Sequence, residues 1–416
     1  MKKISKRLLA LLLAMIMVLS MAACGKKGDE GDNGDAEELS YDEKSAQVYD
    51  AVFGEFEEIY ATSKEADTLS ERWALMAIAE AKLLQTATFI PTNAQNGYYA
   101  MSRMASESEP YAMWGNDEYR FHNLVVATEL LKSEDRAEAK AKWYELRGTG
   151  TYEAWLENFL TGKGYTLKDS YTTIYNTDPI TWDNLATSLA SVSEYVVNTY
   201  DGLTEYDSEG VMKPALAESW EVSEDGLEYT FKIRKGVKWV DSQGREVAEV
   251  KADDFVAGMQ HMMDAMGGLE YLIEGVILNA SEYIDDEITD FSEVGVKAID
   301  DYTLVYTLEQ PTSYFMTMLS YNIFGPMSRS YYESQGGKFG AEYDTSAADY
   351  TYGTSKDTIA YCGPFLCTNH TPQNTMVFTA NPSYWNAANT NIKTLTYTFN
   401  DGSDATKAYN DTLAGT

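Results

Sequence analysis

The segment that most constrains the fold is SWEVSEDGLEYTFKIRKGVKW, residues 219–239. After Asp225 and Gly226, apolar and polar side chains alternate, which is the period of a β-strand with two different faces. The apolar face holds Leu227, Tyr229, Phe231 and Ile233, and the polar face holds Glu228, Thr230, Lys232 and Arg234. Asp and Gly tolerate a positive φ, so this pair predicts the turn of a β-hairpin.

Signals elsewhere in the chain predict a mixed α/β (α+β) fold. In KADDFVAGMQHMMDA, residues 251–265, the apolar residues recur at helical spacing, which predicts a helix whose methionine stripe belongs to the core. Strands are predicted in GVKAIDDYTLVYTL (295–308), NTMVFTA (374–380) and KTLTYTFN (393–400). Residues 41–165 are predicted to be mostly helical, with helices over HNLVVATELL (122–131) and EDRAEAKAKWYELR (134–147).

The first residues have the plan of a secretory signal. Four cations within the first seven residues precede the apolar run Leu8–Ala23, which is shorter than the ~20 residues that span a membrane. Met21-Ala22-Ala23-Cys24 is similar to a bacterial lipobox, which implies that residues 1–23 are removed and that Cys24 carries diacylglycerol. An ordinary secreted protein with Cys24 as a spare thiol is the alternative. Residues 24–40 are rich in Gly and acidic residues and are predicted to be a flexible tether.

Composition and motifs narrow the classes of function. The formal charge of −33 argues against a nucleic-acid partner, because phosphates need cations. The sequence has no GxSxG, HExxH, phosphate-binding or dinucleotide-binding motif, and we expect His122 and His261 to be structural. With 65 acidic residues, no particular carboxylate pair is informative. We therefore expect a protein that is not an enzyme, with no catalytic residue, metal or cofactor.

Two cysteines remain after Cys24, and both lie in CGPFLC as Cys362 and Cys367. Their spacing does not match a redox CxxC, and the partners of a zinc site are missing. A disulfide that closes a small loop and a pair of buried thiols both remain open.

Five ordered blocks carry a family likeness. They are AESWEVSEDGLEYTFKIRKGVKW (217–239), VKADDFVAGMQHMM (250–263), GVKAIDDYTLVYTLEQPTSYF (295–315), CGPF (362–365) and NPSYWN (381–386). Together they resemble the bacterial extracellular solute-binding proteins of family 5, the oligopeptide- and dipeptide-binding lipoproteins of ABC importers. NTDPITWDNL, residues 176–185, looks like the opening stretch of the family. The Cys of CGPF and Met259 depart from the residues most common in the family.

The resemblance implies a periplasmic-binding-protein type II-like clamshell, in which two lobes close on the ligand. On this analogy residues 166–200 are the first part of the first lobe, residues 201–325 an inserted small domain, and residues 326–416 the rest of the first lobe with the start of the second.

The function implied is that of a lipid-anchored, extracytoplasmic peptide receptor on the bacterial cell membrane, a monomer that delivers oligopeptides to the permease subunits of an ABC importer. Binding of another solute such as an oligosaccharide, and a role as a surface sensor or adhesin without transport, are the alternatives. The resemblance suggests these ligand-lining residues: Thr181, Trp182, Asp183, Asn184, Tyr321, Asn322, Cys362 and Gly363. For Trp182, and for Cys362 with Gly363, packing in the core is the competing interpretation.

Two features depart from the family plan. The chain ends at Thr416, where family members continue into most of the second lobe, so we expect a truncated member. SERWALMAIAEAKLL (70–84) and FIPTNAQNGYYAMSR (89–103) resemble the closing elements of the family, which suggests a circularly permuted element within residues 41–165. That hypothesis predicts that residues 89–93 pack on the sheet around Tyr171 to Tyr175; an unrelated helical extension is the alternative.

Overall fold

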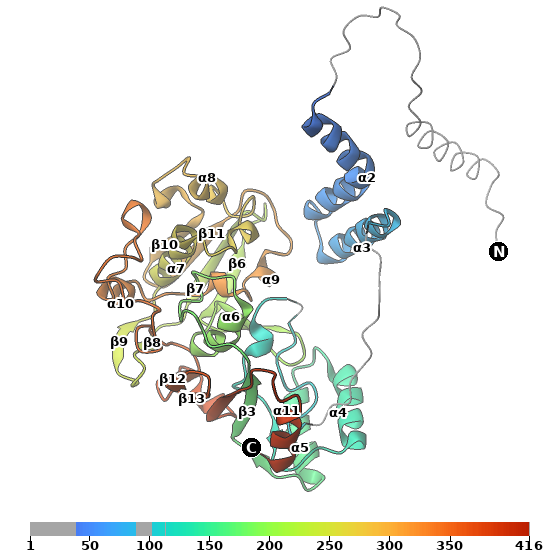
Figure 1. The fold of residues 1–416 in the computed structure, drawn as a ribbon, viewed down its shortest axis with the longest axis vertical. Helices are drawn as coiled ribbons and strands as arrows, with labels where there is room; N and C mark the ends of the chain where they lie inside the picture. The colour runs from blue at the N-terminus through green and yellow to red at the C-terminus, as the bar shows by residue number, and fades with distance from the viewer. Residues whose placement is uncertain (1–38, 89–101, 113, 416) are drawn as a thin grey trace, which may run out of the picture. The chain divides into compact units, whose positions relative to one another are not determined.

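The computed structural model describes residues 39–88, 102–112 and 114–415 (Figure 1). The signal segment, Cys24 and the FIPTN segment therefore lie outside the described residues. The chain divides into two units, residues 1–55 and 56–416, each described by itself. In the first unit the described residues form the start of one exposed helix. Within the described ranges, no helix combines the length and apolarity that a membrane crossing requires.

The described residues form α-helices and short strands. The α-helices are α2 (Tyr41–Lys64), α3 (Leu69–Gln85), α4 (Ser133–Leu146), α5 (Tyr152–Gly162), α6 (Ala190–Val196), α7 (Ala252–Ala265), α8 (Ala280–Ile284), α9 (Phe315–Met318), α10 (Arg329–Ser334) and α11 (Lys407–Ala414). The strands are β1 (Val126–Ala127), β2 (Leu167–Lys168), β3 (Ser170–Tyr175), β4 (Thr204–Tyr206), β5 (Met212–Pro214), β6 (Ala217–Val222), β7 (Glu228–Ile233), β8 (Lys238–Val240), β9 (Glu246–Glu249), β10 (Val296–Asp300), β11 (Thr303–Thr307), β12 (Phe365–Thr371), β13 (Thr375–Ala380) and β14 (Thr394–Phe399).

One antiparallel sheet has the order β10-β11-β7-β6 and contains the predicted hairpin. Gly226 lies in the turn with φ +71°, and Phe231 and Ile233 are buried on one face of β7. Helix α7 packs beside this sheet, and its methionines are in the core as predicted. Asp254 fixes the start of α7, because its carboxylate accepts the N–H of Lys251 (2.9 Å) and the indole N–H of Trp239 (2.9 Å).

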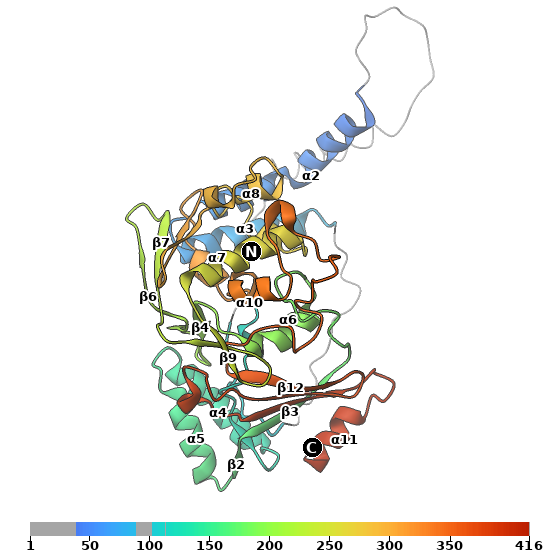
Figure 2. The same ribbon diagram turned by 90° about the vertical axis from the view of Figure 1, so that its left-hand side faces the viewer.

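The second sheet has the order β12-β13-β14-β3. Its first three strands are antiparallel neighbours, whereas β3 lies parallel to β14, with Ser170 opposite Thr394 and Tyr175 opposite Phe399. Figure 2 shows the sheet that contains β3 and β12, with α11 next to it. In the described part of the chain, β3 has a hydrogen-bonded neighbouring strand along one side only, so it is an edge strand.

The predicted helix over residues 122–131 is wrong. Val126 and Ala127 form β1, which pairs with β2, and Met104 bridges to Val126. The four consecutive residues Leu124 to Ala127 are all buried. This pattern is typical of a short strand that is buried on both faces, and not of a helix with one solvent-exposed face. Helix α4 follows as predicted, and with α5 it forms a small separate core around Trp143 and Leu156.

The mixed α/β class is confirmed. The domain boundaries inferred from the family, and the permuted element, stay predictions.

Candidate ligand-binding site

Four of the predicted binding residues, Thr181 to Asn184, lie in the loop that joins β3 to α6. We call this loop, residues 176–189, the β3–α6 loop. Its first turn is fixed by Asp178, which accepts the hydroxyl of Tyr175 (3.0 Å) and the main-chain N–H of Gln373 (2.9 Å). The loop is therefore tied to the edge strand at its start and to the β12–β13 hairpin beside it.

Trp182 anchors the middle of the loop in the core. Its side chain is 3% exposed, and its ring contacts His370 (5.4 Å between centroids) and Phe378 (6.5 Å). Its main-chain N–H donates to the carbonyl of Gly353 (2.7 Å), which also accepts the Thr181 hydroxyl (3.3 Å). Trp182 therefore lies in the core, as the competing interpretation expected. A contact between Trp182 and the ligand stays a prediction.

Asp183 connects the loop to α7. Its Oδ2 lies 2.6 Å from Nε2 of His261, and both side chains are buried. A Cβ at Gly353, where φ is +70°, would lie 2.6 Å from the Cβ of Asp183. The close approach of these two segments of the backbone therefore requires glycine. The buried Asp183 carboxylate thus holds the β3–α6 loop against helix α7.

Asn184 and Asn322 meet, although they are far apart in sequence. The side-chain amide of Asn322 donates to the carbonyl of Asn184 (2.6 Å), and its main-chain N–H donates to the side chain of Asn116 (3.0 Å). The neighbouring Tyr321 packs edge-on against Trp114, with 5.0 Å between ring centroids. The structure therefore connects residues 181–184 to Asn322 by a hydrogen bond, and Tyr321 lies next to Asn322.

Cys362 and Gly363 lie elsewhere. Both donate their main-chain N–H to the carbonyl of Thr199, at 3.1 and 2.9 Å, and neither forms a hydrogen bond to the β3–α6 loop in the described part of the chain. Cys362 and Cys367 are both buried and both free, which fits the buried-thiol alternative. Burial raises the pKa of each thiol. Ligand contact by Cys362 or Gly363 stays a prediction.

The end of the loop, residues 186–189, was missed from the sequence; Ser188 and Leu189 are exposed there, whereas Thr187 is buried. Leu189 is 42% exposed, and Ile180 earlier in the loop is 76% exposed. Within the described ranges, the main-chain groups of Ala186 and Ser188 form no hydrogen bond. The loop also passes so close to Gly267 that a Cβ there would lie 2.5 Å from the carbonyl carbon of Ala186. The only sequence signal was an irregular polar stretch after Pro179.

This arrangement combines a rigid support with free main-chain groups. Buried side chains fix the loop, while the main-chain N–H and C=O groups of Ala186 and Ser188 have no hydrogen-bond partner among the described residues. Such groups suit pairing with an extended ligand backbone. Such pairing does not depend on the side chains of the ligand. No group of three or more His, Cys, Asp or Glu side chains that could hold a metal ion occurs among the residues that the structure covers.

Comparison with known proteins decides the family. Residues 211–415 match the family model for bacterial extracellular solute-binding proteins, family 5 Middle. This part of the chain, residues 211–415, is that of a family 5 bacterial extracellular solute-binding protein. The resemblance read from the five sequence blocks is thereby confirmed.

The family-5 chain is similar to several curated proteins. It is 41% identical over 235 residues to the oligopeptide-binding protein AmiA of Streptococcus pneumoniae, covering 56% of this chain and 34% of AmiA. It is 37% identical over 254 residues to AliB of the same species, covering 61% of this chain and 37% of AliB. The family-5 chain thus spans roughly a third of the length of these relatives.

Solved structures agree with this family. The oligopeptide ABC transporter substrate-binding domain from Bacillus anthracis matches with 30% identity and a TM-score of 0.50, covering 60% of this chain and 44% of that one. The Haemophilus influenzae OppA complex with the peptide RPPGFSPFR matches with 27% identity and a TM-score of 0.51, covering 60% and 45%. About 60% of this chain therefore has the fold of part of an oligopeptide-binding protein.

Proposed function

We propose that this protein is the substrate-binding component of an ABC importer that binds oligopeptides outside the cell and delivers them to a membrane permease. The relatives AmiA and AliB are oligopeptide-binding proteins, and the Haemophilus influenzae OppA structure contains a peptide. We further propose that Cys24 carries a lipid that anchors the mature protein to the bacterial cell membrane as a monomer.

The observation that carries the proposal is the β3–α6 loop. Trp182 and Asp183 are buried and hold the loop in place, while the main-chain groups of Ala186 and Ser188 are free of partners among the described residues. A peptide offers N–H and C=O groups with the spacing of a β-strand, whereas the hydroxyl groups of an oligosaccharide donate and accept hydrogen bonds without that spacing. Main-chain pairing explains how one receptor accepts many peptide sequences.

Native mass spectrometry of the purified chain tests the class of ligand. Retained masses that fragment into amino acids support the proposal, and a ladder of hexose masses would support the oligosaccharide alternative instead. Titration with a hexapeptide library then measures affinity. Deleting the gene and finding every solute uptake unchanged would indicate a sensor or adhesin.

The anchor is tested separately. Metabolic labelling with a clickable fatty acid should label the wild-type protein, and a Cys24→Ala variant should lose the label. Release of unlabelled wild-type protein into the medium would contradict the proposed anchor and would leave the peptide-binding proposal intact.

A further inference from the structure

A cavity of about 200 Å³ lies where the β4–β5 hairpin meets the start of helix α5 and the segments around Ser108 and His122. Its wall includes His122, Glu153 and Glu205, and we call it the Glu205 cavity. None of the described residues that line it belongs to the β3–α6 loop, so it is separate from the proposed peptide site. Its volume is well above what one water molecule needs, which leaves room for a small organic molecule.

Four carboxylates line the Glu205 cavity, and two of them already have partners. Asp207 pairs with the ammonium of Lys213 (3.0 Å) across the β4–β5 hairpin. Glu209 accepts the main-chain N–H groups of Gly150 and Tyr152, both at 2.9 Å, where α5 begins. These two carboxylates therefore hold the hairpin together and fix it to α5.

The other two carboxylates, Glu153 and Glu205, form no ion pair with a lysine or arginine in the described part of the chain. Glu153 accepts the hydroxyl of Ser208 (3.0 Å). Glu205 accepts no hydrogen bond from any described residue, and its contact with Nε2 of His122, at 3.8 Å, is too long for one. A side chain that is only 14% exposed thus keeps its full capacity to accept hydrogen bonds.

His122 lacks partners in the same place. It lines the cavity and is 2% exposed, yet neither ring nitrogen has a hydrogen-bond partner among the described residues. The buried Oδ1 atom of the neighbouring Asn123, which also lines the cavity, has none either. Buried polar atoms without partners cost free energy and are rare in native proteins. Their concentration on the wall of one cavity therefore indicates an occupant that carries hydrogen-bond donors.

The charges around Glu205 favour a cationic occupant. Burial, followed by the negative charge of Asp201, raises the pKa of Glu205 to about 8. Asp117 and Glu153 raise this pKa further, and Arg120, which pairs with Asp117 (2.8 Å), opposes them. Without a cation beside it the Glu205 carboxyl group holds its proton at neutral pH, whereas a positive charge in the cavity would stabilise the carboxylate.

We propose that the Glu205 cavity binds a small organic molecule through its primary ammonium group, which donates hydrogen bonds to Glu205 and to His122. An ammonium group brings three N–H donors and one positive charge, and the cavity offers acceptors and unbalanced negative charge. A metal ion suits this wall less well, because no group of three His, Cys, Asp or Glu side chains that could hold one occurs among the residues that the structure describes. The proposal does not depend on peptide binding.

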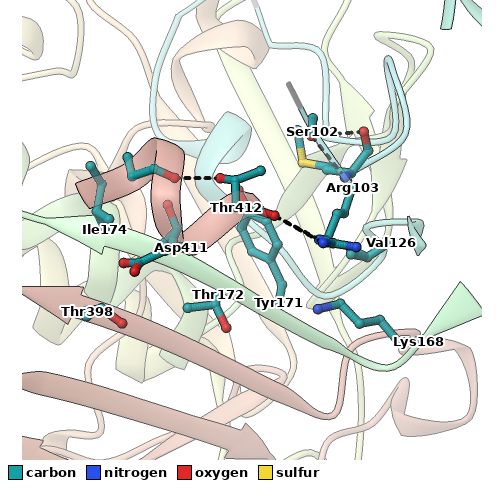
Figure 3. A pocket seen from close by; sticks show the side chains of 13 residues that line it. Ser102, Arg103, Val126, Lys168, Tyr171, Thr172, Ile174, Thr398, Asp411 and Thr412 are labelled. Atoms are coloured by element: carbon teal, nitrogen blue, oxygen red, sulfur yellow. Dashed lines mark hydrogen bonds between the residues drawn. The ribbon is translucent and has the colours of Figure 1, made fainter. Parts of the chain in front are cut away.

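The cavity between β3 and α11 provides a matched control (Figure 3). It has a similar volume, about 190 Å³, and the carboxylate of Asp411 lines it. Unlike Glu205, Asp411 pairs with a lysine, Lys407, at 2.6 Å. Figure 3 also shows the cations Arg103 and Lys168 on the wall of this cavity. Because the charge of Asp411 is already balanced, its removal should not affect the binding of an amine.

Isothermal titration calorimetry of the purified chain with n-propylamine tests the proposal. At about pH 8.5, where Glu205 is mostly ionised, propylamine should bind with a dissociation constant of about 1 mM or lower. 1-Propanol has the same shape without the charge, and tetramethylammonium has the charge without N–H donors. Each should bind at least about tenfold more weakly than propylamine. Between pH 7 and 6 the affinity for propylamine should fall about tenfold, because Glu205 must lose its proton to pair.

Glu205→Gln keeps the size of the side chain and removes its charge. This variant should bind propylamine at least about tenfold more weakly than the wild type, and its affinity should no longer change between pH 7 and 6. Asp411→Asn makes the same change in the other cavity and should keep the wild-type affinity and pH dependence. Circular dichroism checks that each variant is folded, and the comparison of propylamine with propanol needs no variant.

Three results would overturn the proposed ammonium site. They are a wild type that binds propylamine no better than propanol, a Glu205→Gln variant with unchanged affinity for propylamine, and calcium binding that depends on Glu205 in place of amine binding. None of these results bears on the proposed peptide function, and a chain that retains no peptide would leave the amine titrations unaffected.

Discussion

The Nε2 atom of His261 lies 2.6 Å from the Oδ2 atom of Asp183, and this buried contact joins helix α7 to the β3–α6 loop. Asp183→Ala removes the partner of a buried ring nitrogen and should lower the free energy of unfolding by about 2 kcal/mol. Urea denaturation followed by tryptophan fluorescence measures the change. Asp253→Ala, on the same helix, breaks the more exposed pair with Arg329 and should lower it by less than about 1 kcal/mol. Equal effects of the two variants would contradict the structural role of Asp183.

Gly267 sets the position of the same loop. A Cβ at this residue would lie 2.5 Å from the carbonyl carbon of Ala186 and 2.6 Å from the main-chain nitrogen of Thr187. Gly267→Ala should therefore displace the end of the loop, residues 186–189, and weaken peptide binding by roughly tenfold, a loss of about 1.4 kcal/mol. Isothermal titration with a bound peptide measures the loss. Unchanged affinity would show that residues 186–189 do not contact the ligand.

Gly363 is predicted to be a packing residue. A Cβ at Gly363 would lie 2.5 Å from the main-chain nitrogen of Tyr200, which cannot move without disturbing the core. Gly363→Ala should lower the free energy of unfolding by about 1–3 kcal/mol. Gly162→Ala is the control, because Gly162 ends helix α5 with open space around it and should gain up to about 1 kcal/mol. If Gly363→Ala keeps full stability but loses ligand, the residue lines the site instead.

His122 should make the protein sensitive to acid. The ring is 2% exposed, and burial, followed by the charge of Arg120, lowers its pKa to about 3. Because the folded pKa is below the unfolded value of 6.5, the unfolded chain binds the extra proton first. The stability that neutral His122 contributes is therefore complete above pH 6.5 and is lost as the pH falls toward 3.

The variant His122→Phe isolates this effect. Between pH 4 and 6 the free energy of unfolding of this variant should fall less steeply with decreasing pH than that of the wild type. The two slopes should differ by about 1.4 kcal/mol per pH unit, the value for one proton. Tyr384→Phe changes a ring beside His122 without removing a group that titrates in this range, and it should keep the wild-type slope. Parallel slopes for the wild type and His122→Phe would show that His122 is not buried as a neutral ring.

The thiols of Cys362 and Cys367 should be unreactive in the folded protein. Both are buried, and burial raises the pKa of Cys367 to about 12. In a Cys24→Ala background, Ellman's reagent should detect no thiol before denaturation and two afterwards. Detection of none after denaturation would show a disulfide.

Local elements were predictable from sequence because their signals are local. The alternation from Leu227 to Ile233 and the methionine spacing of residues 251–265 each determine one element, and both agree with the structure. Contacts between distant segments were not predictable, since nothing in the sequence near Asn184 indicates that Asn322 will donate to its carbonyl. The short strand at Val126 was mistaken for a helix because a fully buried apolar run has no period that separates the two.

The parallel pairing of β3 with β14 has a consequence for how the protein is made. The two strands of each hairpin, β6–β7 and β10–β11, are close in sequence and can pair early, whereas β3 must wait for residues 394–399. Joining segments so far apart is slow, because the long intervening loop must close first. A nascent chain that emerges N-terminus first therefore carries β3 without its partner strand until residues 394–399 arrive.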